Sequence, residues 1–118
     1  MDESYFVLEN QEVILFISIE ELWFWCCKGQ LVRESGDKFL KKNQITIRPC
    51  SIDDIFKILV RLRFSGKFSK KEVEVLKKYG KKFCPPDFYK FTEREDCLLW
   101  EKSLKKLEIE CKKKEFIE

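Results

Sequence analysis

Lysines are the residues of this sequence whose type and spacing suggest a chemistry most directly. Seven of them lie between positions 67 and 82, in and around the stretch SKKEVEVLKKYGKK. A helical wheel places most of these lysines on one side and the apolar residues on the other. Because clustered ammonium groups attract phosphates, the pattern predicts a surface that binds nucleic acid or another polyanion.

The stretch RLRF, just before these lysines, adds two arginines. Two helices joined by the turn SGKF would have the length of a helix-turn-helix element. Base reading would need Arg, Asn or Gln on the second helix, and residues 70–79 contain none, so phosphate contacts should dominate. The candidate polyanion-binding residues are Arg61, Arg63, Lys67, Lys70, Lys71, Lys78, Lys81 and Lys82.

Two other interpretations of the lysines stay open. A lysine-rich helix face is most often a solvated face that keeps a protein soluble. An acidic protein is the other candidate partner. The segment 1–27 has six acidic residues and no Lys or Arg, so it could also lie against the lysines, within the chain or in a second copy.

Three consecutive aromatic residues, Trp23, Phe24 and Trp25, suggest a second kind of surface. A helix would point them in three directions, and a domain of this size cannot bury all three equally easily. We therefore expect one of them on an exposed apolar patch that contacts a partner protein or a second copy. The alternative is that the core absorbs all three.

Catalytic parts are missing from the sequence. There is no histidine, which removes the commonest general base and every His-dependent triad. Cys26 and Cys27 are adjacent and lack the two-residue spacing of a metal or redox clip. Cys84 is the one thiol expected to be partly exposed, and the lysines before it would favour its thiolate. Without a partner group, it is a labelling handle and not a nucleophile.

Carboxylates and glycines offer no site either. The pair Asp53 and Asp54 is explained by the electrostatics of a first helical turn and needs no metal ion. The glycines are isolated, so no phosphate-cradling loop is predicted. The sequence therefore predicts a non-enzymatic protein with no cofactor and no metal.

Cysteine usage and the N-terminus bear on the compartment. Six cysteines in 118 residues, beside abundant Trp, Phe and Leu, favour free thiols in a reducing cytoplasm. Met1 is followed by acidic residues and not by a basic signal-peptide region. The most apolar run, residues 13–27, is too short for a membrane span and contains two glutamates. We expect a cytoplasmic protein without membrane contact.

One local pattern predicts where helices begin. Ser or Thr is followed three residues later by an acid in SIEE, SIDD, SKKE and TERE. This is the spacing of a capping box, in which the hydroxyl and the acid satisfy free amides of the first turn. Helices are therefore predicted over 19–34, 52–65, 70–79 and 93–114. The third is expected to end at Gly80, as a left-handed C-terminal residue.

These elements predict one domain over residues 1–118. The fold class is mainly α, a compact bundle of about four helices with a minor extended or β N-terminal part. The helix 52–65 is apolar over more than half its circumference, which favours a central position. Residues 1–17 fit a hairpin or an extended arm with one strand, and 45–50 fit a short strand. Residues 112–118 are expected to fray.

Two stretches resemble known families. FSKKEVEVLKKYG resembles the opening of the recognition domain of LuxR-type regulators, but KKFCPPD replaces that domain's polar turn and next helix. GKFSKKEVEVLKKYG and TEREDCLLWEKSL are similar to the small bacterial macrodomain Ori organisation proteins, over about a quarter of the chain. That similarity lies mostly at capping and core positions that any helix pair would share. We therefore transfer no residue role or function from either family.

Overall fold

Four α-helices make up most of the described structure. The computed structural model describes residues 13–35 and 48–118. The prediction of a mainly helical bundle is confirmed. The helices are α2 (Ile19–Ser35), α4 (Ile52–Phe64), α5 (Lys70–Lys82) and α6 (Arg94–Lys113), with the 3₁₀ turn η1 (Phe91–Glu93) directly before α6.

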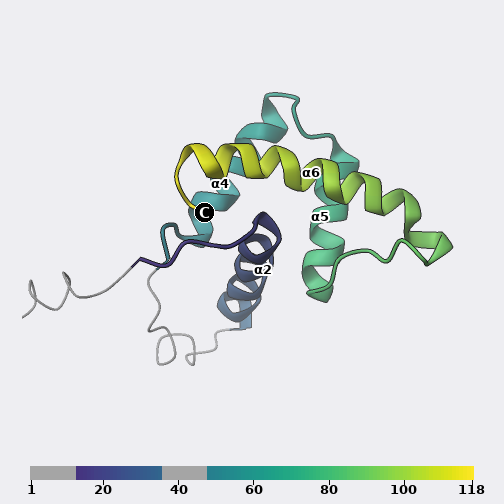
Figure 1. Ribbon diagram of the computed structural model, residues 1–118, viewed down its shortest axis with the longest axis horizontal. Coiled ribbons are helices and arrows are strands. Elements are labelled where there is room, and N and C mark those ends of the chain that lie inside the picture. The colour runs from purple at the N-terminus through teal and green to yellow at the C-terminus, as the bar shows by residue number, and fades with distance from the viewer. Residues whose placement is uncertain (1–12, 36–47) are drawn as a thin grey trace, which may run out of the picture.

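Helix α6 occupies the central position. It runs across the upper half of the molecule in Figure 1, below the turn between α4 and α5, and packs against α5, α2 and α4. The central helix was expected to be 52–65, but in α4 Val60 and Phe64 are exposed. Helix α4 packs on α2 and α6 along one face, and this face does not include all of its apolar residues. It therefore lies at the side of the bundle.

Helix starts follow the predicted caps in two complete cases. Ser51 Oγ accepts from Asp54 N at 3.1 Å and Ser51 N donates to Asp54 Oδ2 at 2.8 Å. Ser69 and Glu72 make the same pair of bonds at the start of α5. At α2 only half of the box forms, because Ser18 Oγ accepts from Glu21 N. The Glu21 carboxylate accepts a hydrogen bond from Ile17 N and not from Ser18 N.

The fourth predicted box is wrong. The chain enters α6 through η1, and the N-cap of α6 is Glu93, which makes no side-chain capping bond. The Glu93 carboxylate instead accepts from Asp87 N at 2.9 Å, which ties the preceding loop to the helix start. Glu93 lies between Thr92 and Glu95, the two residues of the predicted box, and it takes the N-cap position itself.

The end of α5 also differs from the prediction. Gly80 lies inside the helix, and the left-handed residue is Phe83, with φ 52° and ψ 37°. A Cβ at position 80 would lie 2.5 Å from Cys27 Sγ and 3.0 Å from Trp23 Nε1. Gly80 therefore permits close approach of α5 to α2, and the helix continues to Lys82.

The C-terminal segment is ordered, contrary to the expected fraying of 112–118. Phe16 and Ile117 form a parallel β-bridge, with Phe16 N donating to Phe116 O at 3.1 Å and Glu118 N to Phe16 O at 3.0 Å. Both Phe16 and Ile117 are buried. The segment that precedes α2 therefore closes the bundle against the end of α6. Of the strand predicted at 45–50, residues 48–50 are described and form a bend, not a strand. The rest of it and most of 1–17 lie outside the described residues.

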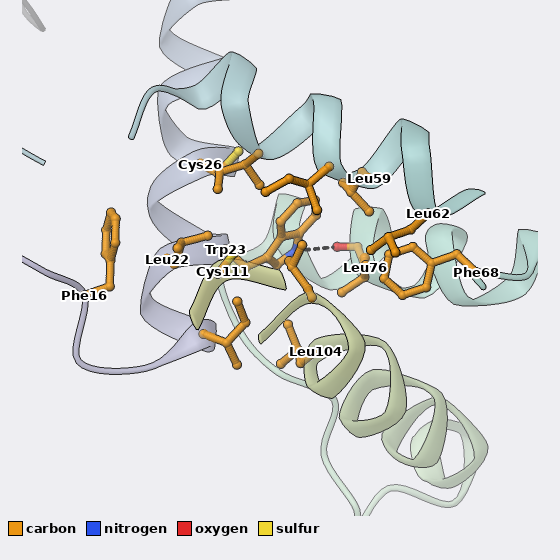
Figure 2. Packing of buried hydrophobic residues seen from close by; sticks show 14 of the residues in the cluster. Phe16, Leu22, Trp23, Cys26, Leu59, Leu62, Phe68, Leu76, Leu104 and Cys111 are labelled. Carbon is orange, nitrogen blue, oxygen red and sulfur yellow. Dashed lines mark hydrogen bonds between the residues drawn. The ribbon is translucent and has the colours of Figure 1, made fainter. Parts of the chain in front are cut away.

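Trp23 lies at the centre of the hydrophobic core. Figure 2 shows its indole between the helices, where Nε1 donates to Leu76 O at 2.9 Å. Leu22 and Cys26 of α2, and Leu104 of α6, surround it in the same cluster. The Trp23 indole thus joins α2 to α5, because its ring is buried in the core and its N–H is hydrogen-bonded to α5.

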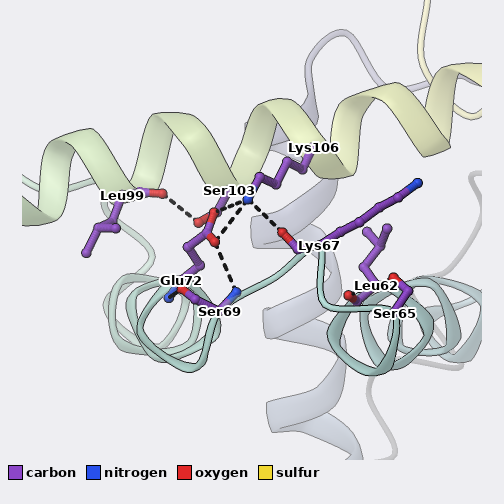
Figure 3. Close-up of polar contacts among 8 residues, drawn as sticks. All are labelled: Leu62, Ser65, Lys67, Ser69, Glu72, Leu99, Ser103 and Lys106. Atoms are coloured by element: carbon purple, nitrogen blue, oxygen red, sulfur yellow. Dashed lines mark hydrogen bonds and ion pairs between the residues drawn. The ribbon is translucent and has the colours of Figure 1, made fainter.

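A buried ion pair fastens the start of α5 to α6. Figure 3 shows Lys106 Nζ reaching the Glu72 carboxylate at 2.9 Å and the Lys67 carbonyl at 2.6 Å. Glu72 is only 4% exposed. Burial pushes the pKa of Glu72 upward, but bonds from Ser69 and Lys106 outweigh it and hold the pKa below its ordinary value of 4.5.

Acidification should therefore weaken the fold. A carboxylate with a lowered pKa binds fewer protons when folded than when unfolded, so its stabilisation is complete at neutral pH and is lost as pH falls below about 4.5. We expect Glu72→Gln to cost about 1–2 kcal/mol at pH 7 and to flatten the acid limb of the stability curve. Urea denaturation between pH 7 and pH 3 measures both effects. The exposed Glu74→Gln on the same helix is the control, and equal curves for both variants would contradict the prediction.

Candidate binding surfaces

The predicted cationic residues do not form one patch on a closely packed helix pair. Helices α4 and α5 pack on α2 and α6 more than on each other, and Figure 3 views both nearly along their axes beneath α6. Arg61 of α4 pairs with Glu110 of α6 at 2.9 Å. Arg63 is exposed on α4, and Lys67 is exposed in the turn between the two helices. A helix-turn-helix element needs two helices packed on each other, and α4 and α5 do not form such a pair.

Helix α5 keeps a cationic surface of its own. Its buried residues Val75, Leu76 and Tyr79 face the bundle, and its lysines are exposed on the remaining sides. Within residues 13–35 and 48–118, five of these lysines form no ion pair. We call them the lysine face: Lys70, Lys71, Lys77, Lys81 and Lys82.

Lys78 differs from the lysine face because it is engaged at the start of α6. Its Nζ lies 3.2 Å from Asp96 Oδ2, and Tyr79 O–H donates to the same oxygen at 2.6 Å. The Tyr79 bond, with help from Lys78, holds the pKa of Asp96 below its ordinary range. Burial and the same bond raise the pKa of Tyr79. This cluster fixes α5 to α6 and leaves the charge of Lys78 largely neutralised.

The three consecutive aromatic residues have different environments. Trp23 is 1% exposed and belongs to the core. Phe24 stacks on Trp100 with ring centroids 5.7 Å apart, and Trp25 packs on Phe16 at 5.0 Å. Phe24 and Trp25 are both half-buried. Trp23 therefore cannot contact a partner in this conformation, whereas parts of its two neighbours can.

Other aromatic residues of the described ranges are more exposed: Phe64 of α4 is 87% exposed, and three more lie in the connection between α5 and α6. Tyr89 is 90% exposed, Phe91 84% and Phe88 59%. The loop is held by bonds of Asp87 with Tyr89 N and Lys90 N, and Arg94 Nε donates to Phe88 O. We call residues 88–91 the aromatic loop. Sequence reasoning missed it, although FYKF directly after the stiff CPPD was a usable signal.

A cavity of about 460 Å³ lies between α2 and the C-terminal half of α5. Its apolar lining comes from three elements of the bundle, and its polar lining includes two members of the lysine face. The lining residues are Trp23, Cys27, Gln30, Leu31, Glu34, Phe56, Lys77, Lys81 and Phe83. We call it the α2–α5 cavity.

A more open groove of about 520 Å³ runs along α6 on another side of the molecule. The start of α2 and the two prolines before the aromatic loop form its edges. Glu20, Glu101 and Glu108 line it with a single lysine, Lys105. An acidic groove of this kind is unsuited to a polyanion.

The cysteines offer no reactive centre in the core. All six are free thiols. Burial raises the pKa of Cys27 and of Cys50 to about 11 each, and that of Cys111 to about 12, so these sulfurs stay protonated at neutral pH. Cys84 is exposed, as expected, and donates to Pro85 O. The described part of the chain contains no group of three or more His, Cys, Asp or Glu residues that could hold a metal ion.

Known proteins do not decide between these surfaces. Comparison of the chain with family models, with curated proteins and with solved structures found no significant match. No described helix is both long and apolar enough to cross a membrane. The candidate sites therefore rest on their own geometry.

Proposed function

We propose that this is a non-enzymatic binding protein that contacts nucleic acid, or a similar polyanion, through the lysine face of α5. The observation that supports the proposal is a five-lysine surface on one 13-residue helix, with no ion pair to any of these lysines in the described ranges. Such ammonium groups neutralise backbone phosphates and release counterions, whatever the base sequence.

The acidic residues near α5 support the same proposal. Glu72 is turned inward to Lys106, and Asp96 is shared by Lys78 and Tyr79. Glu74 is the one exposed acid that α5 itself contributes. Local acids therefore do little to neutralise the lysine face. Arg61 is dropped from the predicted set because Glu110 neutralises it.

Binding of duplex DNA should depend steeply on salt. If about three lysines contact phosphates, affinity should fall roughly 40-fold between 50 and 200 mM salt. Fluorescence anisotropy with a labelled duplex measures this. Lys70→Gln, Lys71→Gln, Lys81→Gln combined should weaken binding at least about tenfold at the lower salt concentration.

The control removes the same number of charges from α6. Lys102→Gln, Lys105→Gln, Lys112→Gln combined has the same net charge but leaves the lysine face intact. It should change affinity by about twofold or less. Absence of binding at 50 mM salt, or an equal loss in both triple variants, would refute a site on α5.

A second candidate is a protein–protein adaptor or homo-oligomeric subunit. It was predicted at Trp23–Trp25, and the exposure of Tyr89 and Phe91 now favours the aromatic loop as its surface. Exposed aromatic side chains are typical of interface centres. Sedimentation of the wild-type protein beside a Tyr89→Ser, Phe91→Ser variant separates self-association through this loop from a monomer.

A further inference from the structure

The α2–α5 cavity has the construction of a small-molecule site. Its volume of about 460 Å³ falls within the range of ligand pockets. Trp23 and Phe56, with ring centroids 6.5 Å apart, and Phe83 give it aromatic walls. Aromatic walls favour a ligand with a flat aromatic ring over a flexible polar ligand.

Gln30 adds an unused hydrogen-bond acceptor to this apolar lining. Its Nε2 donates to Glu34 Oε1 at 3.0 Å, which orients the amide. Its Oε1 is buried and has no partner among the described residues. Buried polar atoms are nearly always paired with protein or with ordered water, so this acceptor can take a bond from water or from a donor of a bound ligand.

Phe83 is held beside the cavity in an unfavourable backbone conformation. Its φ of 52° is left-handed, a region where Cβ crowds the backbone and glycine is preferred. The helix end is nevertheless well formed, with Phe83 N donating to Gly80 O and Cys84 N to Tyr79 O. Strained residues of this kind concentrate at ligand sites, and here the strain places an aromatic ring in the cavity wall.

Two ammonium groups supply a charge preference. Lys77 and Lys81 line the cavity and form no ion pair within the described residues. The one carboxylate in the lining, Glu34, accepts the Gln30 bond. An anionic group of a ligand would therefore be attracted to the lysine side of the cavity.

We propose that the α2–α5 cavity binds a small aromatic anion. The ring would pack against Phe56 and Phe83 beside the buried Trp23, the anionic group would meet Lys77 and Lys81, and a hydroxyl or N–H would donate to Gln30 Oε1. This site goes beyond polyanion binding on the lysine face, with which it shares only Lys77 and Lys81. It does not require that nucleic acid binds.

Three probes with the same ring system test each part of the proposal. 2-Naphthoate carries the anion, 2-naphthol the hydroxyl, and 6-hydroxy-2-naphthoate both. Nitrogen–proton NMR spectra of the full chain localise binding, because Trp23 and Trp100 have indole N–H groups in different environments. We expect saturable shifts of the Trp23 indole and the Phe83 amide with 6-hydroxy-2-naphthoate, at a Kd of about 1 mM or tighter.

Matched variants assign the polar contacts. Lys77→Gln with Lys81→Gln should weaken both naphthoates about tenfold and change 2-naphthol by about twofold or less. Lys102→Gln with Lys112→Gln, on α6, removes equal charge and should change none of the three. Gln30→Met should abolish the preference for the hydroxylated naphthoate, which we expect to be about fivefold in the wild type.

The proposal is overturned if no probe shifts the Trp23 indole at millimolar concentration. It is also overturned if the Trp100 indole, which contacts Glu20 beside the acidic groove, responds equally. If the Lys77→Gln, Lys81→Gln variant and the Lys102→Gln, Lys112→Gln variant bind the naphthoates equally well, the anionic group does not meet Lys77 and Lys81. Because DNA titration is a separate measurement, either proposal can fail while the other stands.

Discussion

Replacement of Trp23 by alanine is expected to destabilise the protein by about 3–5 kcal/mol, the largest effect predicted for any single change. The indole is 1% exposed and contacts both α5 and α4, through Leu76 O and the Phe56 ring. Alanine would leave a cavity at the junction of three helices and remove the hydrogen bond. Since the free energy of unfolding of such domains is only about 5–15 kcal/mol, a loss of this size should raise the unfolded fraction strongly.

Trp25→Ala is the matched control for this prediction. Trp25 is the same residue type on the same helix, but it is half-buried and packs on Phe16 at the edge of the core. We expect it to cost about 1–2 kcal/mol. Urea denaturation followed by circular dichroism gives both free energies of unfolding. Equal losses would mean that Trp23 does not have the central packing role described above.

Gly80→Ala is expected to destabilise the protein by about 2 kcal/mol, although helix propensity alone predicts a gain of about 1 kcal/mol. Position 80 is inside α5, where alanine is normally preferred. The added Cβ would lie 2.5 Å from Cys27 Sγ and 3.0 Å from Trp23 Nε1. The thiol can rotate, but the indole is held by its bond to Leu76 O, so α5 must move away from α2.

The double variant Cys27→Ala, Gly80→Ala tests the cause of that loss. Removing Sγ relieves the closer of the two contacts, so stability should recover in part, with the indole contact remaining. The same urea experiment measures the coupling between the two positions. A stabilising Gly80→Ala would show that propensity dominates and that the close approach of the helices is not needed.

Helix starts were predictable because their causes are local. Ser51 and Ser69 find their partners three residues away, and the helices at these caps begin where the pattern indicates. The mainly helical class followed from the same local signals and is confirmed. TERE has the same spacing but does not form a cap, because Thr92 lies inside the 3₁₀ turn η1 and the N-cap position of α6 falls on Glu93.

The candidate sites were much less predictable. Four of the five residues of the lysine face were predicted from the sequence, and Lys77 was missed. The cavity beside them combines Gln30 of α2, Phe56 of α4 and Phe83 after α5. No local pattern connects these residues. The neutralisation of Arg61 depends on Glu110, 49 positions away. Pairings of this kind appear only when α6 is placed across the other helices.

The sequence by itself determined where α2, α4 and α5 begin, the helical class and the dense positive charge of α5. Interactions within one helical turn decide these properties, and a turn spans about four residues. The tertiary structure alone decided that Gly80 is a packing residue, that Phe83 is the left-handed residue and that Trp23 is buried. Each of these depends on the surface of another helix, and the distance between α2 and α5 depends on the whole core.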